Sequence, residues 1–122
     1  MKKTNVFTDI ENKEYTVKGH INCRSENVVY SIFCRICDKT VYVGQTESLY
    51  QRMLLNFSMI RTKKSDAVAI HFNSRNHSSK DLIIRGIEKI YGEDTFRKIR
   101  ESFWIKKLNT VQPNGLNTQI EF

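Results

Sequence analysis

The fold is decided by residues 28–44, which read VVYSIFCRICDKTVYVG. Both ends of this stretch, Val28–Phe33 and Val41–Gly44, are rich in the β-branched and aromatic residues that favour strands. The connection between them, Cys34–Thr40, contains an Asp-Lys pair suited to a turn. The stretch therefore predicts a β-hairpin.

A helical pattern follows the hairpin. Ser48 can cap a helix whose apolar stripe packs against the hairpin, and Arg52 and Asn56, four residues apart, share one face of it. A short second helix is expected from Asp66 to Phe72, with Ser65 as its cap. The stripe of the first helix starts at its first residue and consists of Leu49, Met53, Leu54, Phe57 and Ile60.

Two further elements complete the domain. Leu82–Ile87 predicts a third strand, ended by Gly92, and Thr95–Leu108 predicts a last helix. The simplest arrangement is an α+β domain in which helices flank a three-stranded antiparallel sheet made of the hairpin and the later strand. We expect a polar lead-in over residues 1–25, with one short strand near Tyr15, and the domain itself over residues 26–122. The candidate buried positions of the last helix are Phe96, Ile99, Phe103, Trp104 and Leu108.

The chain has 122 residues, enough for one compact domain and too few for two. It carries 20 Lys and Arg against 13 Asp and Glu, and the net charge of +7 favours a polyanionic partner. No segment approaches the roughly 20 apolar residues that span a bilayer, and no secretory signal is expected. The expected lack of a secretory signal, together with the odd number of three cysteines, indicates an intracellular, reducing environment. The basic residues form two ridges, around Arg52, Arg61, Lys63 and Lys64 and around Arg97, Lys98, Arg100, Lys106 and Lys107.

Five positions in order resemble the signature of the GIY-YIG nucleases. Tyr30 is the last residue of the first motif, VVY at 28–30, and Tyr42 is the first residue of the second, YVG at 42–44. Arg52, Glu101 and Asn117 follow at about the family's spacing. The resemblance covers about residues 22–117 and is strongest to the endonucleases of Penelope-like retroelements. The phrases that carry this closer likeness are NVVY at 27–30, YVGQT at 42–46, HFNS at 71–74 and FWIKKLN at 103–109.

The resemblance implies DNA cleavage with one divalent cation, Mg²⁺ or Mn²⁺. Glu101 offers a hard carboxylate for that ion, and Arg52 presents a planar, permanently charged fork to phosphate oxygens. By resemblance, Tyr30 takes the proton of the attacking water, Tyr42 hydrogen-bonds the phosphate, and Asn117 braces the tyrosines or the metal shell. A phenol is a poor base at neutral pH, so Tyr30 would need a cation nearby.

Each of these residues also has an ordinary interpretation. Strand tyrosines such as Tyr30 and Tyr42 commonly serve packing, Glu101 could pair with Arg97, and Asn117 could be a turn residue. One departure bears on activity, because Asn56 stands where the family frequently has a histidine, and an amide cannot exchange a proton. The alternative is therefore a zinc-stabilised DNA-binding module of the same fold without turnover; a structure-specific repair nuclease is a weaker one.

A second site is predicted from Cys34 and Cys37, in a CxxC arrangement, and from His71 and His77. Two thiolates and two imidazoles suit tetrahedral Zn²⁺ in a structural role, although a redox CxxC or isolated surface histidines remain alternatives. The retroelement resemblance implies the same four-ligand set, with its cysteines between the two tyrosine motifs. Cys23 is expected to be a spare cysteine, buried or a neighbour of the site rather than a ligand.

The resemblance further implies where such a chain works. In Penelope-like elements the nuclease opens target DNA for reverse transcription and is fused to a reverse transcriptase. We therefore expect DNA as partner, no membrane, and a nuclear location.

Overall fold

The computed structural model describes residues 6–9 and 13–118. Residues 1–5 and 10–12 of the expected lead-in, and residues 119–122 of the expected domain, lie outside the described residues. The elements in chain order are β1 (Val6–Thr8), β2 (Glu14–Thr16), β3 (Glu26–Cys34), β4 (Lys39–Ser48), α1 (Leu49–Arg61), α2 (Ala67–Phe72), a 3₁₀ turn (Ser79–Asp81), β5 (Leu82–Lys89) and α3 (Asp94–Leu108).

The central sheet has the order β4-β3-β5, and both pairings are antiparallel. The predicted hairpin and later strand are confirmed. Central strand β3 places Tyr30 opposite Gly44 on one side and Gly86 on the other, while Tyr42 lies opposite Ile32. Because side chains two residues apart share a face, Tyr30 and Tyr42 project from the same side of the sheet as diagonal neighbours.

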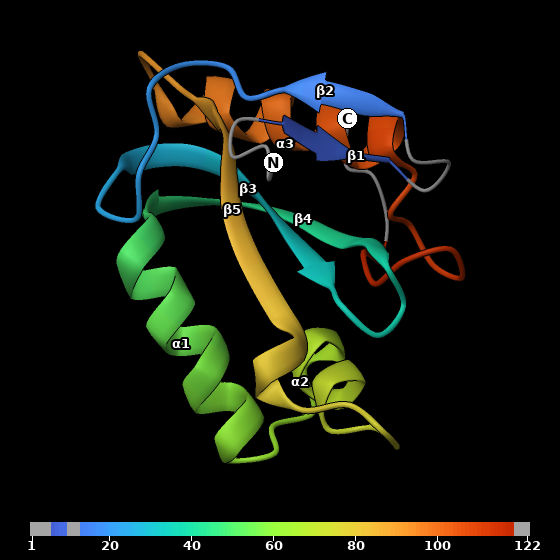
Figure 1. Ribbon diagram of the computed structural model, residues 1–122. Helices are drawn as coiled ribbons and strands as arrows, with labels where there is room; N and C mark the ends of the chain where they lie inside the picture. The colour runs from blue at the N-terminus through green and yellow to red at the C-terminus, as the bar shows by residue number, and fades with distance from the viewer. Residues whose placement is uncertain (1–5, 10–12, 119–122) are drawn as a thin grey trace.

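Each face of the sheet is covered by its own layer, with α1 and α2 on one side and α3 on the other (Figure 1). Alternate residues of β3 divide between the two cores, which explains why its sequence is an almost continuous apolar run. The core under α1 and α2 includes Val28, Tyr30, Ile32, Cys34, Leu49, Ile60, Val68 and Phe72. The core under α3 includes Phe7, Val29, Val43, Ile87, Trp104, Ile105 and Leu108.

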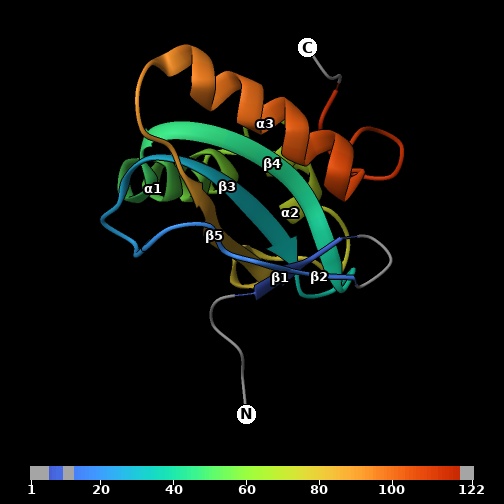
Figure 2. The same cartoon turned by 90° about the horizontal axis from the view of Figure 1, so that it is seen from above.

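The segment expected as a polar lead-in contributes to the second core. β1 and β2 form a two-stranded antiparallel sheet, drawn in front of α3 in Figure 1 and at the lower edge of the view in Figure 2. Phe7 is buried and meets Trp104 edge-on at a centroid distance of 5.2 Å, and Tyr15 meets Trp104 at 5.8 Å. Lys18 then forms a parallel bridge with Glu88 on β5. The short strand expected near Tyr15 is thus one of two.

The N-terminal cap of α1 is the one that the sequence predicts, whereas the cap of α2 is a different residue. Ser48 caps α1 by accepting a hydrogen bond from the Gln51 backbone N–H. For α2 the expected cap, Ser65, is wrong: Asp66 is the cap, and its Oδ2 accepts from the backbone N–H groups of Val68 and Ala69. A carboxylate facing two backbone donors outcompetes a hydroxyl one residue earlier.

Helix α3 buries a different stripe from the one predicted. Trp104 and Leu108 are buried as expected, but Phe96, Ile99 and Phe103 are exposed. The apolar spacing alone did not reveal that polar partners on the sheet draw another side of the helix inward. Leu54 of α1 is also exposed, although its predicted stripe placed it in the core. No helix within residues 6–9 and 13–118 is both long and apolar enough to cross a membrane.

Candidate active site and metal centre

Tyr30 and Tyr42 lie side by side on the sheet face beneath α1 and α2. Their ring centroids are 6.3 Å apart, and the Tyr30 side chain is almost fully buried. Gly44, opposite Tyr30, makes this placement possible, because a Cβ there would lie 2.4 Å from the Tyr30 Oη and 2.5 Å from its Cζ. The glycine of the second motif is therefore a steric requirement of the tyrosine of the first.

Both phenols are held in their neutral form. Burial raises the pKa of Tyr30 well above its ordinary value, with a further increase from neighbouring Tyr42, and the positive charge of Arg52 only partly opposes this. Burial likewise raises the pKa of Tyr42, and there the Glu101 carboxylate adds to the increase while Arg52 opposes it. Arg52 and Glu101, nearly 50 residues apart in the sequence, thus act on the same two hydroxyl groups.

A cavity of about 300 Å³, which we call the tyrosine cavity, opens where β4 meets α2 and α3. Its walls include Tyr42, Asp66, Glu101 and Asn117. The volume corresponds to several water molecules at about 30 Å³ each, so a hydrated ion or one phosphate group has room there. The sequence grouped three of these four residues, whereas Asp66 was expected only as the start of a helix.

Asn117 joins the C-terminal loop to β4. Its Oδ1 accepts from the Val43 backbone N–H at 3.0 Å and from the Thr110 hydroxyl at 2.7 Å, and its Nδ2 donates to the Val43 carbonyl at 2.9 Å. The residue is buried, and these bonds engage both ends of the amide. Asn117 therefore fixes the strand residue next to Tyr42, which is a bracing position.

Asn56 is buried on α1, one turn after Arg52. Its Nδ2 is a buried donor that lacks a hydrogen-bond partner among the described residues. A buried donor left without a partner costs about 1–3 kcal/mol, and such a group is uncommon in a well-packed core.

Arg97, which the sequence placed in a basic surface ridge, has a structural role. It is buried, it donates from Nε to Gln45 Oε1 and from Nη1 to Asn27 Oδ1, and it lies 3.3 Å from the Asp94 carboxylate. The sequence offered Arg97 as a partner for Glu101 and as part of a basic ridge. Arg100 also turns inward, with its Nε 2.9 Å from Glu88 Oε1. The α3 ridge is therefore reduced to its three exposed lysines, Lys98, Lys106 and Lys107.

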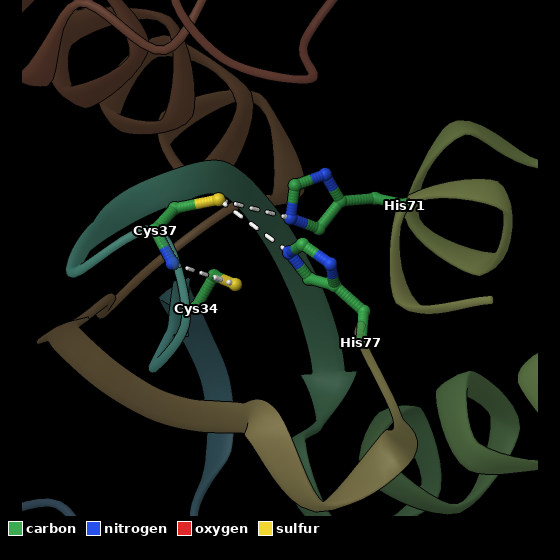
Figure 3. Close-up of side chains that lie close together, drawn as sticks. All are labelled: Cys34, Cys37, His71 and His77. Carbon is green, nitrogen blue, oxygen red and sulfur yellow. Dashed lines mark hydrogen bonds between the residues drawn. The ribbon is translucent and has the colours of Figure 1, made fainter. Parts of the chain in front are cut away.

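The four predicted metal ligands meet at the far end of the hairpin (Figure 3). One donor atom from each of Cys34, Cys37, His71 and His77 lies within 4.8 Å of all the others. We call this group the Cys/His cluster. The Cys37 sulfur is 3.7 Å from His71 Nε2 and 3.6 Å from His77 Nε2. Sulfur and nitrogen ligands of a tetrahedral zinc ion lie about 3.5 Å apart, given Zn–S and Zn–N bonds near 2.3 and 2.0 Å.

The surroundings of the cluster also suit a metal. His77 is oriented through its Nδ1, which is 3.0 Å from the Arg75 carbonyl and leaves Nε2 directed at the cluster. Burial lowers the pKa of His71, with His77 adding to the effect, so its imidazole is neutral and able to act as a ligand. Cys23 is exposed and lies outside the cluster. The Cys/His cluster could therefore bind zinc.

Comparison with known proteins agrees with this geometry at the level of the fold. No family model and no curated protein matches the chain. Among solved structures, the catalytic domain of the homing endonuclease I-TevI is similar, with 25% identity, a TM-score of 0.65, and coverage of 77% of this chain and 99% of that one. A mutant of the same catalytic domain is similar with 25% identity, a TM-score of 0.67, and coverage of 80% and 98%.

The chain has the fold of a GIY-YIG nuclease domain. Almost the whole of the I-TevI catalytic domain is represented, so the predicted α+β class and the nuclease-like architecture are confirmed. The likeness does not address the narrower resemblance to Penelope-like elements.

Proposed function

We propose that this chain is a divalent-metal-dependent endonuclease that hydrolyses phosphodiester bonds in DNA. The observation that carries the proposal is the tyrosine cavity, which both Tyr42 and Glu101 line. Arg52, although not among the lining residues, acts electrostatically on both tyrosines. The likeness to the I-TevI catalytic domain supports the same conclusion from an independent direction. The net charge of +7 suits a polyanionic substrate.

Each residue in the proposal has a chemical task. The Arg52 guanidinium binds phosphate oxygens and offsets the negative charge that grows as phosphorus becomes five-coordinate. Tyr42, kept neutral by burial, donates a hydrogen bond to the phosphate. Asn117 keeps Tyr42 in place through its bonds to the Val43 backbone. Positioning and electrostatic stabilisation are the main sources of catalysis in such reactions.

The donor set fits a hard divalent cation. Glu101 supplies a carboxylate oxygen in a cavity with room for several water molecules, and Mg²⁺ typically retains such waters while binding one or two carboxylates. When bound, Mg²⁺ or Mn²⁺ would supply Lewis-acid stabilisation of the phosphate and the leaving oxygen. The structural ion is proposed to be separate, with Zn²⁺ in the Cys/His cluster.

The biological setting rests on the sequence resemblance. We propose that the domain nicks or cuts target DNA during insertion of a Penelope-like retroelement, as a domain normally joined to a reverse transcriptase. This setting implies a location inside the cell, in the nucleus. We also propose that the nuclease domain proper begins near residue 26, with β1 and β2 of the preceding segment packed on its core.

A plasmid assay tests the activity. Zinc-loaded protein with Mg²⁺ or Mn²⁺ should relax supercoiled plasmid, and Arg52→Ala and Glu101→Gln should each lower the rate by a factor of about 10² or more, as is typical when a charge-stabilising group is lost. Gln51→Ala and Glu93→Gln are matched controls, because both side chains are exposed; Gln51 precedes Arg52 on α1, and Glu93 is the residue just before α3. Equal activity in Arg52→Ala and the parent would reject the assignment.

The alternative, a DNA-binding module without turnover, is favoured by Asn56. It predicts plasmid binding that weakens steeply with salt but no relaxation with any divalent ion. Under this alternative, Asn56→His would confer relaxation activity on an otherwise inert protein. An active parent that Asn56→His leaves unchanged argues for the endonuclease.

A further inference from the structure

The tyrosine cavity needs a group that accepts a proton, and neither Tyr30 nor Asn56, which stands at the family's frequent histidine position, is suited to it. Tyr30 is almost fully buried, its pKa is raised, and it does not line the cavity. Asn56 is an amide, which has no exchangeable protonation state near neutral pH. A carboxylate that lines this cavity is therefore the better candidate to take the proton that the attacking water loses.

Asp66 has the required chemistry and position. It lines the same cavity as Tyr42 and Glu101, and it is exposed to solvent. Both hydrogen bonds that it makes as the α2 cap, at 3.1 and 3.2 Å, are accepted by Oδ2. The cap therefore fixes the carboxylate at the cavity wall without using Oδ1.

The environment of Asp66 comes from four elements. Tyr42 on β4 and Glu101 on α3 share the cavity wall with it, and its charge also acts on Tyr30 of β3. Arg52 on α1 acts on the same two phenols and is the cation of the group. Asp66 is thus part of one electrostatic unit with the residues that the sequence had already singled out.

We infer that Asp66 is a catalytic residue of the proposed nuclease, the one that accepts the proton of the attacking water. This inference rests on the proposed function. In the step, the water oxygen forms a bond to phosphorus, and its proton passes to Asp66 Oδ1. The bond from phosphorus to the leaving sugar oxygen breaks, and the departing oxygen takes a proton from solvent. Tyr30 then serves to position Tyr42.

The decisive variant is Asp66→Asn. Asparagine caps helices about as well as aspartate, so α2 and the thermal stability should be kept while the proton acceptor is lost. The single-turnover nicking rate should fall by a factor of about 10²–10⁴, the usual contribution of general acid–base catalysis, with DNA affinity unchanged or higher. Tyr30→Phe should lower the rate much less. In Asp66→Ala, added formate should restore part of the rate, because it supplies a carboxylate to the vacated wall.

The possible outcomes separate this inference from the proposed function. If the parent cleaves and Asp66→Asn cleaves equally fast, the inference fails and the nuclease assignment stands. If Tyr30→Phe is inactive and Asp66→Asn is not, Tyr30 is the base. Mn²⁺ affinity, measured by electron paramagnetic resonance on zinc-loaded protein, should be kept in Asp66→Asn and lowered in Glu101→Gln. Loss of Mn²⁺ binding in Asp66→Asn would make Asp66 a ligand and overturn the inference. A parent that never cleaves overturns both.

Discussion

The Cys/His cluster and the tyrosine cavity meet at the same short helix, α2, but differ in how their side chains are arranged. Asp66, the cap of α2, lines the cavity. His71, near the end of α2, belongs to the cluster. The cluster brings four donor atoms within 4.8 Å of one another. The cavity instead keeps its polar groups apart around a space of about 300 Å³.

This difference is the one expected between a structural metal site and a catalytic site. Donor atoms in mutual contact enclose one ion and leave no position open, as structural zinc sites do. Polar groups around a space can receive a phosphate and its water. Because both sites share α2, the cluster also anchors the short helix whose cap forms part of the cavity wall. A helix of six residues has little stability of its own, so this anchor matters.

Loss of zinc should give the largest effect, because it removes that anchor. We expect a strong zinc chelator, or Cys34→Ser, to lower the melting temperature by roughly 10–20 °C. This follows from a binding contribution of about 4 kcal/mol when free zinc exceeds Kd a thousandfold. Differential scanning calorimetry and metal analysis by mass spectrometry measure both quantities.

Cys23→Ser is the matched control, since Cys23 is exposed and outside the cluster. It should keep one zinc per chain and the parental melting temperature. If neither the chelator nor Cys34→Ser changes the melting temperature, the cluster is not a structural zinc site, and the contrast between the two sites does not hold.

Gly44→Ala should give the next largest effect, on the sheet face that carries the two tyrosines. The new Cβ would lie 2.4 Å from the Tyr30 Oη, and the ring has no room to move because it is almost fully buried. We expect a loss of about 1–3 kcal/mol of stability, as for other overpacked cores, with zinc content unchanged. In a double-mutant cycle with Tyr30→Val, much of this penalty should vanish, and additive penalties would show that Gly44 has another role.

The sequence predicted what depends on local spacing. The CxxC pair and the two histidines are each close in sequence, and the strands around Tyr30 and Tyr42 follow directly from β-branched and aromatic residues. What it missed depends on distant partners. Arg97 looked like a surface cation, yet Asn27 and Gln45, which are 70 and 52 residues away in the sequence, supply the hydrogen bonds that let it be buried.

Asp66 was missed for the same physical reason. Read locally, an aspartate before a short apolar run is a helix cap, and it is one. Its second property, lining one cavity together with Glu101 and Tyr42, exists only once α2 and α3 pack on opposite faces of the sheet. Likewise Phe7 and Tyr15 gave no sign that they would meet Trp104, because the contact joins segments about 90 residues apart.

The smallest expected effect on stability concerns Asn56. Leucine has nearly the same shape as asparagine, and replacing a buried donor that lacks a partner by an apolar group is commonly neutral or stabilising. Asn56→Leu should therefore keep or raise the melting temperature, by an amount equivalent to about 1 kcal/mol. If the Nδ2 donor serves the bound substrate or its water, the same variant should lower the nicking rate while stability holds.

The matched comparison is Phe57→Leu, the next residue on the same helix and a partly buried member of the adjoining core. It should lower stability because it removes apolar contacts, with little effect on the nicking rate per folded molecule. Stability changes of opposite sign in the two variants, with nicking lowered only in Asn56→Leu, would indicate that the Asn56 amide serves the reaction at a cost in stability. If Asn56→Leu instead lowers the melting temperature by several degrees and leaves the nicking rate intact, its amide belongs to the core.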